Sequence, residues 1–259
     1  MGMPVASLDE RALLDLMFAE LDAGRGGWLI TANLDFMRRW ASDPAQRELY
    51  AAADLRVADG MPLLWAARLQ GDPLPERVTG SGLVWTLCAR AAVEGRRVLL
   101  LGGDEGAAEA ARDVLTARSP ALEVVGTASP WVHNPPTPEE IESIAGLLES
   151  TRPDIVLVGL GSPKQEVLIS GLREHFPGMW FVGVGISFSF VAGMVERAPA
   201  WAQQAGLEWA HRLAQEPRRL ARRYLLEDIP FSARFFGSAL LVRARRLARR
   251  QKQARRTDR

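Results

Sequence analysis

The chain has little of what secreted and membrane-spanning proteins use. Cys88 is the only cysteine among 259 residues, which excludes an intramolecular disulfide and a cysteine-built metal site. No apolar stretch approaches the ~20 residues that span a bilayer, and the longest candidate, Phe231 to Val242, contains Arg234. The N-terminal residues lack the basic start and apolar run of a signal peptide. We therefore expect a cytoplasmic protein.

Motifs for metals and cofactors are also scarce. His133, His175 and His211 form no cluster in the sequence, and there is no Asp-x-Asp pair of the kind that holds a metal on a nucleotide sugar. No Gly-x-Gly is completed to Gly-x-Gly-x-x-Gly, and the Walker lysine motif is absent. These absences disfavour a nicotinamide oxidoreductase and an ATP site. We expect metal-independent chemistry without a cofactor.

Charge is divided unevenly along the chain. Residues 212–259 contain 15 Lys and Arg against 4 Asp and Glu, whereas residues 1–211 contain 17 against 27. An acidic body with a basic tail points to a polyanionic partner such as membrane lipid, pyrophosphate or nucleic acid.

Short apolar runs alternate with helical patterns, which is typical of a parallel α/β sheet. The expected strands are Trp28–Ala32, Leu55–Ala58, Arg97–Leu101, Leu122–Thr127, Ile155–Gly159 and Trp180–Val184, and the helices between them include Glu105–Arg118 and Pro138–Leu148. Strands stop after about Gly193, and Pro199 and Pro217 each suggest the start of a helix. We predict a Rossmann-like catalytic domain at 1–195, with a mostly parallel sheet flanked by helices, and an arginine-rich helical appendage at 196–259.

The expected strands end in loops rich in glycine and polar residues, where α/β proteins bind ligands. The glycines are Gly102, Gly103, Gly159, Gly161, Gly183 and Gly185. Glycine lets backbone N–H groups approach a phosphate, but it also serves simply to make a tight turn from strand to helix. Either role fits any one of these loops.

Two charged residues in this region are candidates for chemistry. Asp59 follows a strand and precedes a glycine and a helix, so it is either a helix cap or a general base. A positioned carboxylate base contributes about 10²–10⁴-fold to a rate when proton transfer accompanies bond formation. Arg77 is either a fork-shaped phosphate donor or a surface arginine.

Several motifs, in order, resemble the WecG/TagA/CpsF glycosyltransferase family between about Thr31 and Tyr224. They are Val78-Thr79-Gly80-Ser81 after Arg77, Val158-Gly159-Leu160-Gly161-Ser162-Pro163-Lys164-Gln165-Glu166, and the series Arg197-Ala198-Pro199, Gly206-Leu207-Glu208-Trp209, Glu216-Pro217-Arg218-Arg219 and Arg222-Arg223-Tyr224. Their shared order and spacing carry the resemblance.

The resemblance implies an inverting enzyme that moves a sugar, often N-acetylmannosamine, from a UDP-sugar donor to a polyprenyl-diphosphate-linked sugar. Such products feed teichoic acid and exopolysaccharide synthesis. Asp59 matches the family's base, and Thr31, Asn33, Arg77 and Gln165 match residues that line its active site. Arg212, Arg219 and Arg222 match appendage arginines that hold the acceptor diphosphate. The six loop glycines would border the donor nucleotide.

The sequence departs from the family pattern at three positions. Ala32 replaces a frequent proline, Gly82 an expected aspartate, and Ser189 a usual aspartate. The last two changes remove carboxylates near the expected donor pocket, so the sugar specificity stays open.

The tail continues the basic pattern past Pro230. Two helical rows contain the apolar residues Phe231, Phe235, Ala239 and Val242, and Phe236, Leu240, Ala244 and Leu247; Arg245, Arg249, Lys252 and Arg256 form a separate stripe. A helix with an apolar and a basic face is typical of proteins that bind to an anionic membrane surface, which would place the enzyme peripherally on the inner face of the cell membrane. Alternatively, the phenylalanines pack on the body or on another subunit, which leaves homo-oligomers open.

A second interpretation is a non-enzymatic adaptor that uses the tail as a hook for membrane or nucleic acid. The adaptor interpretation does not explain why Asp59, Gln165 and the glycine loops are present. The tail also lacks the interleaved aromatic residues that single-strand binding favours, so we expect no nucleic-acid partner.

Overall fold

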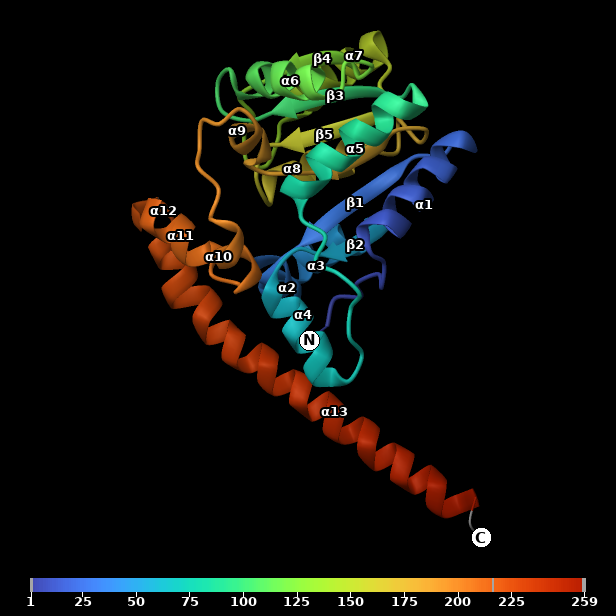
Figure 1. Cartoon of the computed structure of the whole chain (residues 1–259), viewed down its shortest axis with the longest axis vertical. Coiled ribbons are helices and arrows are strands. Elements are labelled where there is room, and N and C mark those ends of the chain that lie inside the picture. The colour runs from blue at the N-terminus through green and yellow to red at the C-terminus, as the bar shows by residue number, and fades with distance from the viewer. Residues whose placement is uncertain (1, 216, 258–259) are drawn as a thin grey trace.

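The computed structural model describes residues 2–215 and 217–257, without the side chains of residues 200, 204, 219, 223 and 249–257, and contains one six-stranded sheet (Figure 1). The strands are β1 (Gly27–Ala32), β2 (Leu55–Ala58), β3 (Arg97–Gly102), β4 (Glu123–Ala128), β5 (Ile155–Gly159) and β6 (Trp180–Gly183). Their order is β2-β1-β6-β5-β3-β4, and each neighbouring pair is parallel. The predicted Rossmann-like α/β class is therefore confirmed, and each observed strand overlaps its predicted range.

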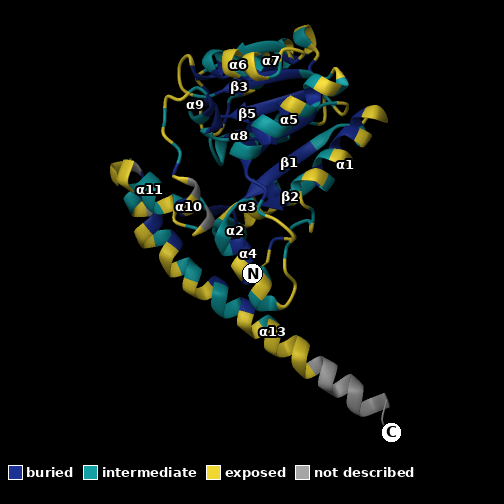
Figure 2. Ribbon diagram, viewed as in Figure 1, coloured by how far each residue is buried: buried dark blue, intermediate teal, exposed yellow. Residues whose placement is uncertain are grey.

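Helices cover both faces of the sheet, which explains why its strands are continuous apolar runs. One face packs on α1 (Glu10–Asp22), α5 (Gly80–Glu94), α6 (Ala107–Arg118) and α9 (Ser187–Val191). The other packs on α2 (Leu34–Ser42), α3 (Pro44–Ala51), α4 (Met61–Gln70), α7 (Pro138–Thr151) and α8 (Lys164–Leu172). Along β1, Leu29 lies in the first core, whereas Trp28 and Ile30 lie in the second. The buried sheet between the two layers is dark blue in Figure 2.

The start of α7 is fixed by a capping box between Thr137 and Glu140. The Thr137 hydroxyl accepts the Glu140 N–H at 3.3 Å, and the Glu140 carboxylate accepts the Thr137 N–H at 2.9 Å. Pro138 occupies the first turn, where the helix needs no N–H. These contacts fix where the helix begins.

The chain after β6 is helical, as predicted. It contains α10 (Ala200–Gln204), α11 (Glu208–Gln215), α12 (Pro217–Ala221), the π-helical turn η1 (Arg222–Asp228) and α13 (Ile229–Thr257). Pro217 is the first residue of α12, whereas Pro199 immediately precedes α10. No helix of the described residues is long and apolar enough to cross a bilayer.

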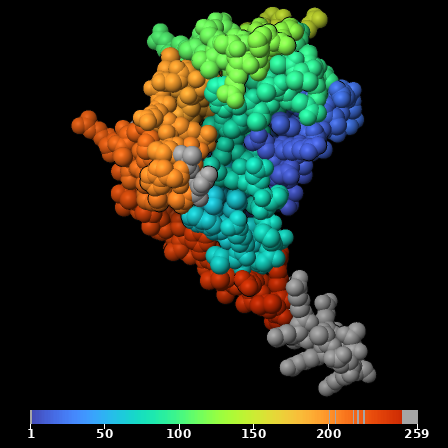
Figure 3. All heavy atoms as spheres, viewed as in Figure 1, coloured from blue at the N-terminus to red at the C-terminus, as the bar shows by residue number. Residues whose placement is uncertain are grey.

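Helix α13 packs along α4, and the two lie side by side in Figure 3 as the red and cyan segments. Phe235 is only 4% exposed and belongs with Ala239 to the same core as the strand residues. The Phe231 ring stacks on the Phe235 ring at 5.8 Å. Packing on the body is thus the correct alternative for these phenylalanines, and the prediction that they enter a membrane is wrong for Phe235. The side chains of Arg249, Lys252 and Arg256 lie outside the described residues.

Candidate active site

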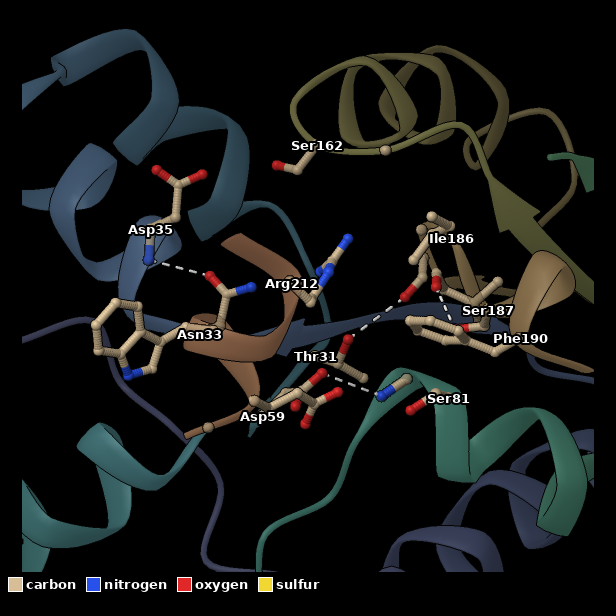
Figure 4. A pocket seen from close by; sticks show the side chains of 18 of the residues that line it. Thr31, Asn33, Asp35, Asp59, Ser81, Ser162, Ile186, Ser187, Phe190 and Arg212 are labelled. Atoms are coloured by element: carbon tan, nitrogen blue, oxygen red, sulfur yellow. Dashed lines mark hydrogen bonds between the residues drawn. The ribbon is translucent and has the colours of Figure 1, made fainter. Parts of the chain in front are cut away.

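A cleft of about 1610 Å³ opens at the carboxyl edge of the sheet, between the strand ends and the segment from α10 to η1. This is the edge where parallel strands present their following loops. The predicted residues that line the cleft are Thr31, Asn33, Asp59, Arg77, Gln165, Gly103, Gly159, Gly161, Gly183, Gly185 and Arg212. Gly102 is different, because the space beside its Cα is filled by the Leu160 side chain. Figure 4 shows several of these side chains converging on one space.

Asp59 follows β2 and is half-buried at the cleft wall. Its own N–H donates to the Ala32 carbonyl at 2.7 Å, which ties the start of the loop to β1. Its Oδ2 accepts the N–H of Gly80, the first residue of α5, at 3.2 Å (Figure 4). Helix α4, which follows Asp59, has Gly60 as its N-cap and no side-chain cap. Asp59 therefore does not cap the helix that follows it.

The surroundings of Asp59 make it a stronger base than an ordinary carboxyl. Burial raises its pKa to about 6, while the hydrogen bond from Gly80 acts in the opposite direction. The charge of Glu208 raises the pKa further, and those of Arg77 and Arg197 lower it. At neutral pH the group is mainly ionised, yet it holds a proton more readily than an exposed aspartate does.

Arg77 belongs to a charged group that connects the body with the C-terminal segment. Its Nη1 lies 3.4 Å from one oxygen of Glu208, and the Nε of Arg197 lies 3.6 Å from the other. The Arg77 side chain is 18% exposed, so the surface-arginine alternative is wrong. Glu208 and Arg197 stand in the family motifs of the sequence, but their contacts in this group were not predicted, because 131 positions separate Arg77 from Glu208. Together the three residues place two guanidinium groups near Asp59.

Thr31 and Asn33 lie on either side of the end of β1. The Thr31 hydroxyl donates to the Gly183 carbonyl at 3.4 Å, which connects β1 to the loop after β6. Asn33 caps α2, since its Oδ1 accepts the N–H of Asp35 at 3.0 Å. In Figure 4 the remaining amide nitrogen of Asn33 points into the cleft. It is free to donate to a ligand there.

Gln165 is a buried brace between two glycine loops. Its Oε1 accepts the N–H groups of Gly161 and Gly185, both at 3.2 Å, and its Nε2 donates to Glu166 at 2.7 Å. Burial also raises the pKa of the Glu166 carboxyl to about 6. A Cβ on Gly183 would lie 2.5 Å from the Gln165 nitrogen, so a side chain at this position would displace Gln165 from its hydrogen bonds.

These bonds also limit how the glycines can hold a phosphate. The N–H groups of Gly161 and Gly185 are used by Gln165, and that of Gly103 donates to the Gly159 carbonyl at 2.8 Å. In this arrangement the three glycines contribute close approach and tight turns rather than free donors.

The three appendage arginines do not share one location. Arg212, on α11, lines the cleft (Figure 4). Arg222 is 85% exposed, lies 3.9 Å from Glu227 and does not line the cleft. The side chain of Arg219 lies outside the described residues. The appendage is fixed to the body by Arg38 of α2, which pairs with Asp228 of η1 at 3.2 Å.

The two departures from the expected aspartates have different surroundings. Gly82 does not line the cleft, and its missing side chain would face the Thr79 hydroxyl and Glu10. Ser189 does line the cleft, and its hydroxyl donates to the Asp104 carboxylate at 2.8 Å. Asp104 lies in the predicted glycine loop after β3, where only the glycines had been singled out. A carboxylate is therefore present beside position 189 although it comes from another element.

Across the described residues, no three His, Cys, Asp or Glu side chains are grouped to hold a metal ion. A comparison with protein families gives a match to the glycosyl transferase WecG/TagA/CpsF family over residues 1–246. The match covers the sheet, the cleft and most of the C-terminal helices.

Proposed function

Since the chain belongs to the WecG/TagA/CpsF glycosyltransferase family, whose members act in cell-surface polysaccharide synthesis, we propose that it is an inverting, metal-independent enzyme of the following kind. It moves N-acetylmannosamine or a related hexose from a UDP-sugar to a sugar on a polyprenyl diphosphate. The observation that carries the proposal is the Asp59 carboxylate, which faces the cleft near two arginines and has its pKa raised to about 6 by burial. Membership of a transferase family also argues against a purely non-enzymatic adaptor.

In the proposed reaction, an acceptor hydroxyl attacks the anomeric carbon of the donor sugar while Asp59 takes the hydroxyl proton. The new carbon–oxygen bond forms on the face opposite the nucleotide, so the configuration inverts. The bond between the anomeric carbon and the phosphate oxygen breaks, and its electron pair leaves with the nucleoside diphosphate. Asp59 suits this task because a general base works best when its pKa lies near the operating pH.

The leaving diphosphate gains negative charge that cationic groups must balance. Arg77 and Arg197 are cleft arginines whose charges act on Asp59, and the single carboxylate of Glu208 pairs with both of them, which leaves one positive charge. A diphosphate would compete with Glu208 for the two guanidinium forks, which suit phosphate oxygens. Glycines at the ends of β5 and β6 leave room for phosphates to lie close to the backbone.

In the proposed arrangement, the acceptor diphosphate binds to the helical appendage at 196–259 and the donor binds to the catalytic domain at 1–195. Arg212 supports this assignment because it lines the cleft from α11. The exposed apolar side chains of the appendage, Leu225, Leu226, Ile229, Leu240 and Leu241, support a peripheral position on an anionic membrane. The lipid chain of the acceptor would then stay in the bilayer while its sugar enters the cleft.

The test is a donor screen with a short-chain lipid-diphosphate sugar as the acceptor. UDP-N-acetylmannosamine, UDP-N-acetylglucosamine and UDP-glucose are compared for transfer, with and without EDTA. We expect EDTA-insensitive transfer from one of them and its loss in Asp59→Asn. Glu142→Gln, which removes an exposed carboxylate on α7, is the matched control and should keep full activity. No transfer from any nucleotide sugar, or full turnover in Asp59→Asn, would contradict the proposal.

A further inference from the structure

Asp104 is a cleft carboxylate that the reaction described above does not use. It follows β3 at the carboxyl edge of the sheet, and the residue is exposed to the cleft. Its Oδ2 accepts the hydroxyl of Ser189 at 2.8 Å, and Ser189 is itself only 1% exposed. A buried side chain thus fixes the direction of an exposed carboxylate and leaves the second oxygen available to a ligand.

The partners of Asp104 differ from those of other carboxylates in the cleft. Asp35 and Glu208 each pair with arginines, which satisfies their charge inside the protein, whereas Asp59, Glu105 and Glu196 have no such pair among the described residues and only Asp104 is held by a buried hydroxyl. Among the described residues, Asp104 has no such ion pair and is held by a neutral hydroxyl. A carboxylate oxygen without a cation nearby is a strong acceptor for hydroxyl groups and repels phosphate.

The position of Asp104 in the sheet indicates which end of a donor it would meet. Four steps in the strand order separate β2, which carries Asp59, from β3, which carries Asp104. At about 4.8 Å a step, the two strand ends lie roughly 19 Å apart. One sugar ring cannot reach both carboxylates, so Asp104 faces the far end of a donor whose sugar lies at Asp59.

The neighbouring loop has a side chain that suits the same end. Trp131 follows β4, lines the cleft and is 73% exposed. Its ring makes an edge contact with the His133 ring at 4.2 Å. An exposed aromatic face after β4 and a carboxylate after the neighbouring strand β3 match a nucleoside, in which a flat base is attached to a ribose diol.

We propose that Asp104 binds the ribose hydroxyls of the nucleoside diphosphate donor and that Ser189 positions it. The inference rests on the proposed function and adds the orientation of the donor. The sugar lies over β1 and β2, the diphosphate over the glycines of β5 and β6, and the ribose over β3. Specificity for a ribonucleotide then comes from the β3 loop, and a donor without its ribose hydroxyls loses a charge-assisted hydrogen bond.

The experiment measures binding of UDP, 2′-deoxy-UDP and 3′-deoxy-UDP to the full chain by titration calorimetry. We expect the protein to bind UDP about tenfold or more tightly than at least one deoxy analogue, which is the usual effect of a hydrogen bond to a charged group. Asp104→Asn should weaken UDP binding and bring the ratio of the UDP affinity to the deoxy-UDP affinity close to one. Ser189→Ala keeps the Asp104 carboxylate but removes the hydrogen bond that orients it. Its ratio of UDP to deoxy-UDP affinity should therefore lie between the ratios of the unaltered protein and of Asp104→Asn.

The matched control is Glu105→Gln, which removes one negative charge from the adjacent cleft residue and should keep the wild-type ratio. Melting temperatures confirm that each variant is folded. An unchanged ratio in Asp104→Asn, or a loss of the ratio in Glu105→Gln, overturns the inference while UDP binding still supports the proposed function. If the unaltered chain binds neither UDP nor GDP nor ADP, the nucleotide donor is wrong and the inference is overturned with it.

Discussion

The pH dependence of turnover tests the role of Asp59 most directly. Burial raises its pKa to about 6, so about 90% of the protein has an ionised Asp59 at pH 7 and about 10% at pH 5. The base must be ionised to accept a proton. We therefore expect kcat/KM to fall about tenfold between pH 7 and pH 5. An aspartate with its ordinary pKa would still be mainly ionised at pH 5 and would give almost no fall.

The assay is the initial rate of transfer over a range of acceptor concentrations at pH 4.5–8.5, which gives both kcat and kcat/KM, with the fold followed at each pH by circular dichroism. Asp59→Asn should reduce kcat by about 10²–10⁴-fold, and its residual rate should lose the acidic limb. Glu166 is the necessary control, since burial raises its pKa to about 6 as well. Glu166→Gln should keep the acidic limb. An acidic limb that survives in Asp59→Asn and disappears in Glu166→Gln would refute the assignment of the base.

Three further changes test the site and its support. Gly183→Ala should reduce the free energy of unfolding by about 1–3 kcal/mol and raise the donor KM, because its Cβ would collide with Gln165; chemical denaturation and kinetics measure the two effects. Phe235→Ala should cost about 3–5 kcal/mol of stability, since the ring is buried, whereas a ring used mainly for membrane contact would cost little. Asp59→Asn should raise the melting temperature at pH 8 but not at pH 4. Because burial raises the pKa of Asp59, the ionised carboxylate destabilises the folded state above pH 6, and the neutral asparagine removes this cost. At pH 4 Asp59 is already protonated in the folded state, so the substitution removes nothing. An equal rise at both pH values would show that another property of the asparagine is responsible.

Much of the sheet and the place of the site could be predicted from the sequence. The strand at residues 155–159 is a continuous apolar run, and such runs are specific for strands buried on both faces. Asp59 and Gln165 follow different strands but meet at one edge because parallel strands place their carboxyl ends together. The local pattern and the rules of the fold were enough for these features.

Contacts between segments that are far apart in the chain could not be predicted from the sequence. The family resemblance grouped Arg222 with Arg212 and Arg219, but the chain forms a π-helical turn from Arg222, and its side chain points to solvent. The apolar face with Phe235 was recognised, yet periodicity does not say what a face packs on. Asp104 and the pairing of Glu208 with Arg77 were missed because the partners come from other elements, far away in the chain.

The packing of α13 on α4 also determines which apolar surface the protein exposes while it is being synthesised. Phe235 and Ala239 complete a core whose other members come mainly from the first 181 residues. During synthesis that side of α4 therefore remains uncovered until α13 has left the ribosome. Until then the nascent protein exposes an apolar surface that is open to association with chaperones or with other chains.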